Sequence, residues 1–182
     1  MKSIENYIKS FGKGVIKRAR IRLSRNKKNV SKTLYNSLDF KVKMDEDFKL
    51  TFFMADYGQF IDQGVSGRNK GRTYTSWKLK TERSDFAYTS SMPPPSALDK
   101  WIVRKGLAPR DESGRFKGRS VDKVGFRKSI SFLMARKIFF QGIQGISFFS
   151  EPIGLELKKL PPNLLEIVEK DVIETFVKLN TK

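Results

Sequence analysis

The chain has 182 residues, enough for one domain with a substantial core, and its 37 Lys and Arg against 19 Asp and Glu give a net charge of +18. It contains no cysteine and no histidine, which excludes disulfides, thiolate nucleophiles, Ser-His or Cys-His catalysis and the usual zinc sites. Residues 151–182 hold five Lys and six acids, so residues 1–150 carry the excess and indicate an acidic partner: nucleic acid, a membrane surface or an acidic protein surface.

The first predicted element is an amphipathic helix from Ser3 to about Leu23. Gly12 and Gly14 weaken its middle by about 1 kcal/mol each relative to Ala. This stretch lacks the continuous apolar core of a signal peptide, and no apolar run of 18 residues exists, so we expect a soluble intracellular protein without a membrane span. The apolar residues at helical spacing are Ile4, Tyr7, Ile8, Phe11, Val15, Ile16, Ala19 and Leu23.

The second half of this helix continues into a basic segment, Lys17 to Lys32, with eight basic residues and no acid. A basic amphipathic helix can lie on a polyanion or a membrane. The alternative is an ordinary helix with its apolar stripe on the core and a solvated basic surface. The candidate contacts for a polyanion or an interface are Arg18, Arg20, Arg22, Arg25, Lys27 and Lys28.

A short helix at Ser31 to Leu38 and then a β-hairpin are predicted next. Apolar residues alternate on both sides of a tight acidic turn at residues 45–47. Period two is the spacing of one face of a strand, so one face of the hairpin is expected to be buried. The residues of that face are Phe40, Val42, Met44, Phe48, Leu50, Phe52 and Met54.

A further short helix is expected within Ala55–Gly67, with Tyr57, Phe60 and Ile61 on one side and Gly64 as its C-terminal cap. A long insertion loop follows at about 65–95. It is polar and rich in Gly, Ser, Thr and Arg. Loops of this length inside a compact domain are usually functional or become ordered on binding. Within the loop, strands are expected at Thr73–Leu79 and Phe86–Thr89.

Three more helices are predicted, at Ser96–Gly106, Phe126–Phe140 and Pro161 to about Leu179, with a basic loop at about 105–123. The middle helix is expected to bury Ile130, Leu133, Met134 and Ile138. Together the elements predict an α+β fold in a single domain, residues 1–182: an N-terminal helix, a hairpin or small antiparallel sheet packed against helices, extended basic loops and a long C-terminal helix.

Two loops share the pattern Ser-Gly-Arg-x-Lys-Gly-Arg, at Ser66–Arg72 and Ser113–Arg119. Neither has the spacing of a nucleotide-binding loop. We interpret them as basic loops that can contact a phosphate backbone or an acidic neighbour. Their candidate contact residues are Arg68, Lys70, Arg72, Arg115, Lys117 and Arg119.

Two other sites were weighed. Tyr74, Trp77, Phe86 and Tyr88 lie among basic residues and could form a stacking platform for single-stranded nucleic acid, or could simply hold the loop on the body. Glu156-Leu157-Lys158 has the E-x-K pattern of Mg²⁺-dependent nucleases on a strand-like segment, but no Pro-Asp partner precedes it convincingly. No catalytic residue, cofactor site or metal site is predicted, and an enzyme is not expected.

The segment Arg136–Ile153 combines the end of a helix with two glycines and two Phe-Phe pairs. Gly142 is predicted as the C-terminal cap, and Gly145 as a second bend. Either both Phe-Phe pairs fill one core, or the second pair inserts into a neighbouring subunit. The candidate subunit-interface aromatics are Trp77, Phe148 and Phe149.

The order of motifs resembles the tail-completion or neck proteins of tailed bacteriophages, which join head to tail. Tyr57-Gly58-Gln59-Phe60-Ile61-Asp62-Gln63-Gly64 is similar to the family's Tyr-x-x-x-Val-Glu-x-Gly. The segment Pro94 to Leu107 and the helix end at Gly142-Ile143 before Phe148-Phe149 extend the resemblance over most of residues 1–180. The extended insertion between Gly64 and Pro93 departs from the family pattern.

The resemblance implies a ring-forming, non-enzymatic subunit of the virion neck, assembled in the host cytoplasm. Its partners would be further copies of itself, the connector or portal on one side, the tail on the other, and DNA in the lumen. A nucleic-acid-binding protein that uses residues 17–32 and the Gly/Arg loops is the alternative, and a Mg²⁺ nuclease is a remote one. Ring stoichiometry and the identity of the neighbours do not follow from the sequence.

Overall fold

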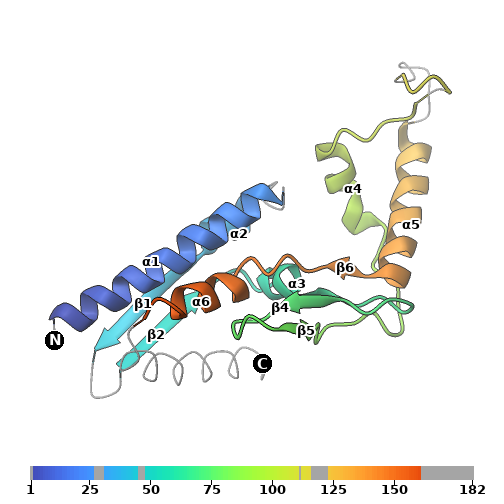
Figure 1. Ribbon diagram of the computed structural model, residues 1–182. Coiled ribbons are helices and arrows are strands. Elements are labelled where there is room, and N and C mark those ends of the chain that lie inside the picture. The colour runs from blue at the N-terminus through green and yellow to red at the C-terminus, as the bar shows by residue number, and fades with distance from the viewer. Residues whose placement is uncertain (1, 27–30, 45–47, 111, 116–122, 161–182) are drawn as a thin grey trace.

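The computed structural model describes residues 2–26, 31–44, 48–110, 112–115 and 123–160, which form a mixed α+β fold (Figure 1). The strands pair as three two-stranded antiparallel sheets, β1–β2, β3–β6 and β4–β5. The elements are α1 (Lys2–Arg25), α2 (Thr33–Ser37), β1 (Asp39–Met44), β2 (Phe48–Phe53), α3 (Gly58–Gln63), β3 (Gly64–Val65), β4 (Thr73–Thr75), β5 (Thr81–Arg83), α4 (Ser96–Arg104), α5 (Lys123–Gln141), β6 (Ile143–Gln144) and α6 (Ser150–Leu157).

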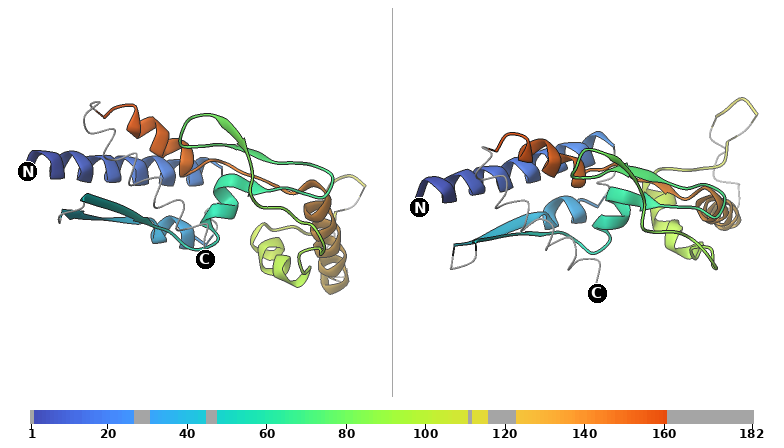
Figure 2. Two further views of the ribbon diagram at one scale, coloured as in Figure 1. Left: turned by 90° about the horizontal axis from the view of Figure 1, so that it is seen from below. Right: turned by 60° about the horizontal axis from the view of Figure 1, so that its bottom comes forward.

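Helix α1 is the centre of the core and lies between the β1–β2 hairpin and α6 (Figure 2). The predicted N-terminal helix is therefore confirmed. Its two glycines are points of close approach. A Cβ at Gly12 would lie 2.6 Å from the Phe40 ring, and one at Gly14 would lie 3.0 Å from the carboxylate of Glu156. Both glycines lower the helix propensity of α1, but their missing side chains leave space for contacts with neighbouring elements.

The predicted hairpin and the short helix before it are confirmed. Strands β1 and β2 pair in the register Phe40↔Phe52 and Val42↔Leu50, which places the alternating apolar residues on one face. Leu50 and Phe52 are buried against α1, and the Phe52 ring meets that of Phe149 edge-on at 5.3 Å. The turn at 45–47 lies outside the described residues.

Residues 61–69 run antiparallel to residues 139–147 and form the middle of the molecule. Outside the β3–β6 pair, this pairing continues through Ser147 N–H to Asp62 O (2.9 Å) and Arg68 N–H to Phe139 O (2.9 Å). Two glycines of the second segment allow the backbones to come into contact. A Cβ on Gly145 would meet the backbone of Gln63, and one on Gly142 would meet the backbone of residues 65–67.

Gly142 ends α5 as predicted, with φ +70° and an N–H that donates to Ile138 O at 2.7 Å. The expectation for Gly145 needs correction. The residue with left-handed backbone in the following turn is Ser147, at φ +47°, while Gly145 is required for space rather than for a bend.

The insertion loop contains a small hairpin. Its first strand begins at Thr73 as predicted but ends at Thr75, and its second is β5 rather than Phe86–Thr89. The chain turns between them through an Ser76 N–H to Lys80 O bond of 2.9 Å. Ala87 makes only an isolated bridge with Ser66.

Helices α4 and α5, together called the arm, pack against each other and project from the body opposite the N-terminus (Figures 1 and 2). The expected buried face of α5 is partly wrong. Ser131 and Ala135 are buried, Leu133 is 56% exposed, and the other three predicted residues, Ile130, Met134 and Ile138, are half-buried. The predicted helix at 161–179 lies outside the described residues.

Candidate functional site: a basic groove along α1

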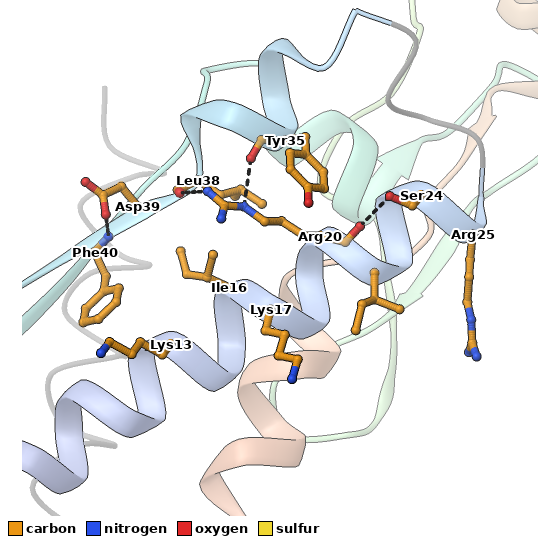
Figure 3. A pocket seen from close by; sticks show the side chains of 11 residues that line it. Lys13, Ile16, Lys17, Arg20, Ser24, Arg25, Tyr35, Leu38, Asp39 and Phe40 are labelled. Atoms are coloured by element: carbon orange, nitrogen blue, oxygen red, sulfur yellow. Dashed lines mark hydrogen bonds between the residues drawn. The ribbon is translucent and has the colours of Figure 1, made fainter.

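A groove of about 610 Å³ runs between α1 and the segment from α2 into β1 (Figure 3); it is called the α1 groove below. Its floor is mainly apolar, and its charged residues are four cations and one carboxylate. The lining residues are Lys13, Ile16, Lys17, Arg20, Ile21, Ser24 and Arg25 of α1, with Tyr35, Leu38, Asp39 and Phe40 opposite.

Helical spacing aligns the rim of the groove. Lys13, Lys17, Ile21 and Arg25 follow each other at four-residue intervals, so they form one row along α1, with about 6 Å of helix rise between successive members. All four are exposed. Ile21 places an exposed apolar side chain inside the row of cations.

Arg20 holds the groove in shape. Its guanidinium donates to Tyr35 O and Leu38 O, both at 3.1 Å, and lies over the Tyr35 ring at 5.1 Å from the ring centre (Figure 3). These contacts join α1 to α2 and to the start of β1. Arg20 is thus engaged within the subunit, although the sequence grouped it with surface contacts.

Arg18 and Arg22 lie on a different side of α1 and hold α6. Arg18 pairs with Glu156, and Arg22 pairs with Glu151 and donates to Ile146 O at 3.3 Å. The predicted basic segment is therefore divided between two roles. Arg25 remains an exposed cation of the groove, and Lys27 and Lys28 lie outside the described residues.

Sequence reasoning missed Lys13 and treated Lys17 only as the first residue of the basic segment. The signal was present: the spacing of Lys13, Lys17 and Arg25 matches one side of a helix. Their side was not recognisable as a groove, because the wall opposite comes from α2 and β1, and its position depends on the tertiary fold.

Glu156 predicts a dependence of stability on pH. Burial raises the pKa of this carboxyl, but the contacts with Lys159 and Arg18 outweigh burial, and its pKa lies below the ordinary value. Because the folded-state pKa is depressed, the ionised carboxyl stabilises the fold above the unfolded-state pKa of about 4.3. This stabilisation is lost as pH falls through the folded-state pKa. We expect Glu156→Gln to cost about 1 kcal/mol at pH 7 and less at pH 3, in urea unfolding. Glu5→Gln, which breaks an exposed pair with Lys9, is the control; parallel pH profiles for wild type and Glu156→Gln would contradict the assignment.

Asp62 is the most buried acid in the described part of the chain, at 4% exposure. Its carboxylate accepts hydrogen bonds from Phe149 N–H (2.6 Å), Ser150 N–H (3.2 Å) and the Ser150 hydroxyl, so it caps the N-terminus of α6. Burial raises the pKa of Asp62, and the bonds from Ser150 and Phe149 and the charge of Arg22 only partly offset this. Of the three apolar residues predicted on one side of the short helix α3, Ile61 packs against the core, whereas Tyr57 and Phe60 are exposed.

The first Gly/Arg loop is fixed to the body rather than free. Arg72 donates to Gln141 O at 2.7 Å and to the Gln144 side chain at 3.1 Å, and Gly67 N–H donates to Lys70 O. Of the second loop, the structure describes residues 113–115, which lie beyond the far end of the arm (Figure 1). Arg115 is exposed, and Lys117 and Arg119 lie outside the described residues. The described part of the second loop therefore does not meet the first.

The expected interface aromatics need correction. Phe148 is fully buried and Phe149 is 3% exposed, both in the core of their own subunit, and Trp77 is partly buried against the same core. For the aromatics of the insertion loop, the structure favours the second alternative, in which they hold the loop on the body. Tyr74 and Tyr88 are half-buried, and Phe86 packs edge-on against Phe60 at 4.5 Å.

Exposed apolar side chains occur on both helices of the arm. Trp101 and Val103 of α4 and Phe132 and Leu133 of α5 are all at least 39% exposed. Sequence reasoning missed this surface because it assigned one buried stripe to each helix. The signal was the consecutive apolar run 132–134 beside Ile130, which is wider than one packed face.

The structure contradicts the strand-like segment on which the nuclease interpretation was based. Glu156 lies in a helix, not a strand, and pairs with Arg18 and Lys159, while Lys158 is the residue that ends α6. Among the residues that the structure describes, no three His, Cys, Asp or Glu side chains gather in a way that could hold a metal ion.

Membrane insertion and known relatives were both tested. Within the described ranges, no helix combines the length and the apolar character needed to cross a bilayer. Comparison with protein-family models, curated proteins and solved structures gives no match for this chain.

Proposed function

We propose that this chain is a structural subunit of the neck of a tailed phage, a tail-completion protein that assembles into a ring between head and tail. The observation that carries the proposal is the arm. It projects from the body (Figure 1), and its Trp101, Val103, Phe132 and Leu133 side chains are exposed. Its partners would be copies of itself, the connector or portal side, and the tail side, in the virion.

The arm has the character of an assembly surface. Two packed helices bury only a narrow seam, here around Ile102 and Ala135, and leave their outer faces to other partners. Apolar side chains left exposed on a projecting element, with charged residues nearby, are the kind of surface that a partner protein can cover. Lys100, Arg104 and Lys137 supply such charges on the arm.

The resemblance to neck proteins adds a second line of support. Its two main motifs, 57–64 and 142–149, lie far apart in the sequence but pack directly on each other through β3–β6 and the Asp62 cap. Motif residues that meet in one packed unit are what a shared fold requires. The family assignment itself remains a proposal.

Removal of the aromatic groups of the arm is expected to prevent assembly. Aromatic anchors commonly contribute about 2 kcal/mol or more each to an interface. Trp101→Ser or Phe132→Ser should therefore each weaken self-association by at least about thirtyfold, and the two together by more. Light scattering after size exclusion, over a range of protein concentrations, measures the change.

Tyr7→Ser is the matched control, because Tyr7 is an exposed aromatic residue on α1, away from the arm. Circular dichroism should show that all variants keep their helices. A wild-type chain that stays monomeric at high concentration, and that mass spectrometry does not find in purified particles, would overturn the proposed function.

A further inference from the structure

We propose that the α1 groove receives residues 161–182 of a second copy of this chain. This inference rests on the proposed ring assembly and specifies one of its contacts. The described part of the chain ends at Leu160, so the proposed occupant is the segment that follows. Three properties support it: the chemistry of the groove, the chemistry of the segment and the direction in which the chain leaves the core.

The groove offers an apolar floor and a cationic rim. Ile16, Leu38 and Phe40 line the floor, while Lys13 and Lys17 stand exposed beside it. Within the lining, four cations and one carboxylate leave a charge of +3. An amphipathic segment with acids beside its apolar stripe would satisfy both parts of the groove.

Residues 161–182 have this composition. They contain four acids and three Lys, in a chain whose net charge is +18. Leu165, Val168, Val172, Phe176 and Leu179 give the apolar stripe predicted from the sequence. On such a helix Glu169 lies four residues after Leu165 and three before Val172, so it borders the stripe.

The lengths also agree. The helix predicted at 161–179 would span about 28 Å, and α1, with 24 residues, spans about 36 Å. A segment lying along α1 could therefore follow the row from Lys13 to Arg25. Apolar contacts would be made on Ile21 within that row.

Nucleic acid fits the groove less well than a protein segment. The Tyr35 ring is covered by the guanidinium of Arg20, and the Phe40 ring packs over Gly12 and beside Phe52. These contacts occupy faces of both rings on which a base would otherwise stack. An apolar floor also adds nothing to phosphate binding, which depends on cations and hydrogen-bond donors.

The position of α6 favours a second copy over the same chain. Helix α6 meets α1 at Gly14 and Arg18, and Leu160 packs on the core on that side. The row of Lys13 and Lys17 is rotated by about 100° around α1. A segment that starts at Leu160 would have to pass around α1 to enter its own groove. A contact passed from each copy to the next is head-to-tail, which is the type of contact from which rings are built.

A charge exchange between full-length chains tests the inference. Lys17→Glu and Glu169→Lys should each weaken self-association by about tenfold or more, because like charges then face each other. Mixing the two variants in equal amounts should restore assembly, since each groove then finds a complementary segment. Lys43→Glu, an exposed cation of β1 outside the groove, should leave the association unchanged.

Each other outcome overturns the inference. Single variants that assemble like wild type would exclude the groove contact and leave the ring proposal intact. Assembly of the Lys17→Glu, Glu169→Lys double variant, without rescue in the mixture, would place the segment in its own groove. If Lys17→Glu lost binding to a 30-nucleotide DNA while its self-association stayed unchanged, the groove would be assigned to nucleic acid. A monomeric wild type would instead overturn the proposed function.

Discussion

Replacing Gly145 with alanine is expected to lower the free energy of unfolding by about 3 kcal/mol, at the upper end of overpacking costs. A Cβ at this position would meet the backbone of Gln63 and the carbonyl oxygen of Asp62, closer than side chains approach in real proteins. Backbone atoms cannot move aside as a flexible side chain can. Separating residues 61–65 from 143–147 would also disturb the Asp62 cap of α6. Urea unfolding followed by circular dichroism measures the loss.

Gly106→Ala is the control, because Gly106 has left-handed backbone at φ +63° but open space around its Cα. Alanine there should cost about 1 kcal/mol, from backbone strain alone. If Gly145→Ala were no worse than this control, the close approach of the two backbones would not be a determinant of the fold.

Elements whose signal is local were predictable from the sequence. Helix α1 and the β1–β2 hairpin each show one period of apolar residues over a long enough stretch, and both occur where expected. The α+β class followed from their order. Gly142 was also correctly identified as a helix end, because a left-handed cap is a local requirement.

Features that depend on partners far along the chain were not predictable. Asp62 and Phe148 are 86 residues apart in sequence, and nothing local shows that one caps the helix that follows the other. The same holds for Arg18 and Arg22, whose acidic partners lie on α6. A basic segment looks the same in sequence whether its charges face solvent or a distant carboxylate.

The burial of the second Phe-Phe pair, rather than of both pairs, could not be predicted for the same reason. Both pairs are apolar and flank glycines, so composition does not rank them. The tertiary fold places 148–149 between α1 and β2, whereas Phe139 and Phe140 end α5 at the base of the arm and stay half-buried. The second pair is buried because it follows β6, whose pairing with β3 directs the chain into the core.

Asp62→Ala is expected to destabilise the fold by about 3 kcal/mol. The substitution leaves the N–H groups of Phe149 and Ser150 and the Ser150 hydroxyl without their acceptor in a buried site. An unsatisfied buried donor costs about 1–3 kcal/mol, and loss of a helix cap costs about 1 kcal/mol. Asp56→Ala, at an exposed acid six residues earlier, should change stability by less than about 0.5 kcal/mol.

Asp62→Asn keeps the shape of the side chain but removes its charge, so it isolates the effect of ionisation on stability. Because burial raises the pKa of Asp62 in the folded state, its contribution is fully present below the unfolded-state pKa of about 3.9 and falls as pH rises through the folded-state value. The stability advantage of wild type over Asp62→Asn should therefore shrink from pH 3.5 towards pH 7, opposite in sign to the effect of Glu156. Urea unfolding at both pH values measures the difference, and an advantage that grows with pH would show that the carboxylate form is the one the fold prefers.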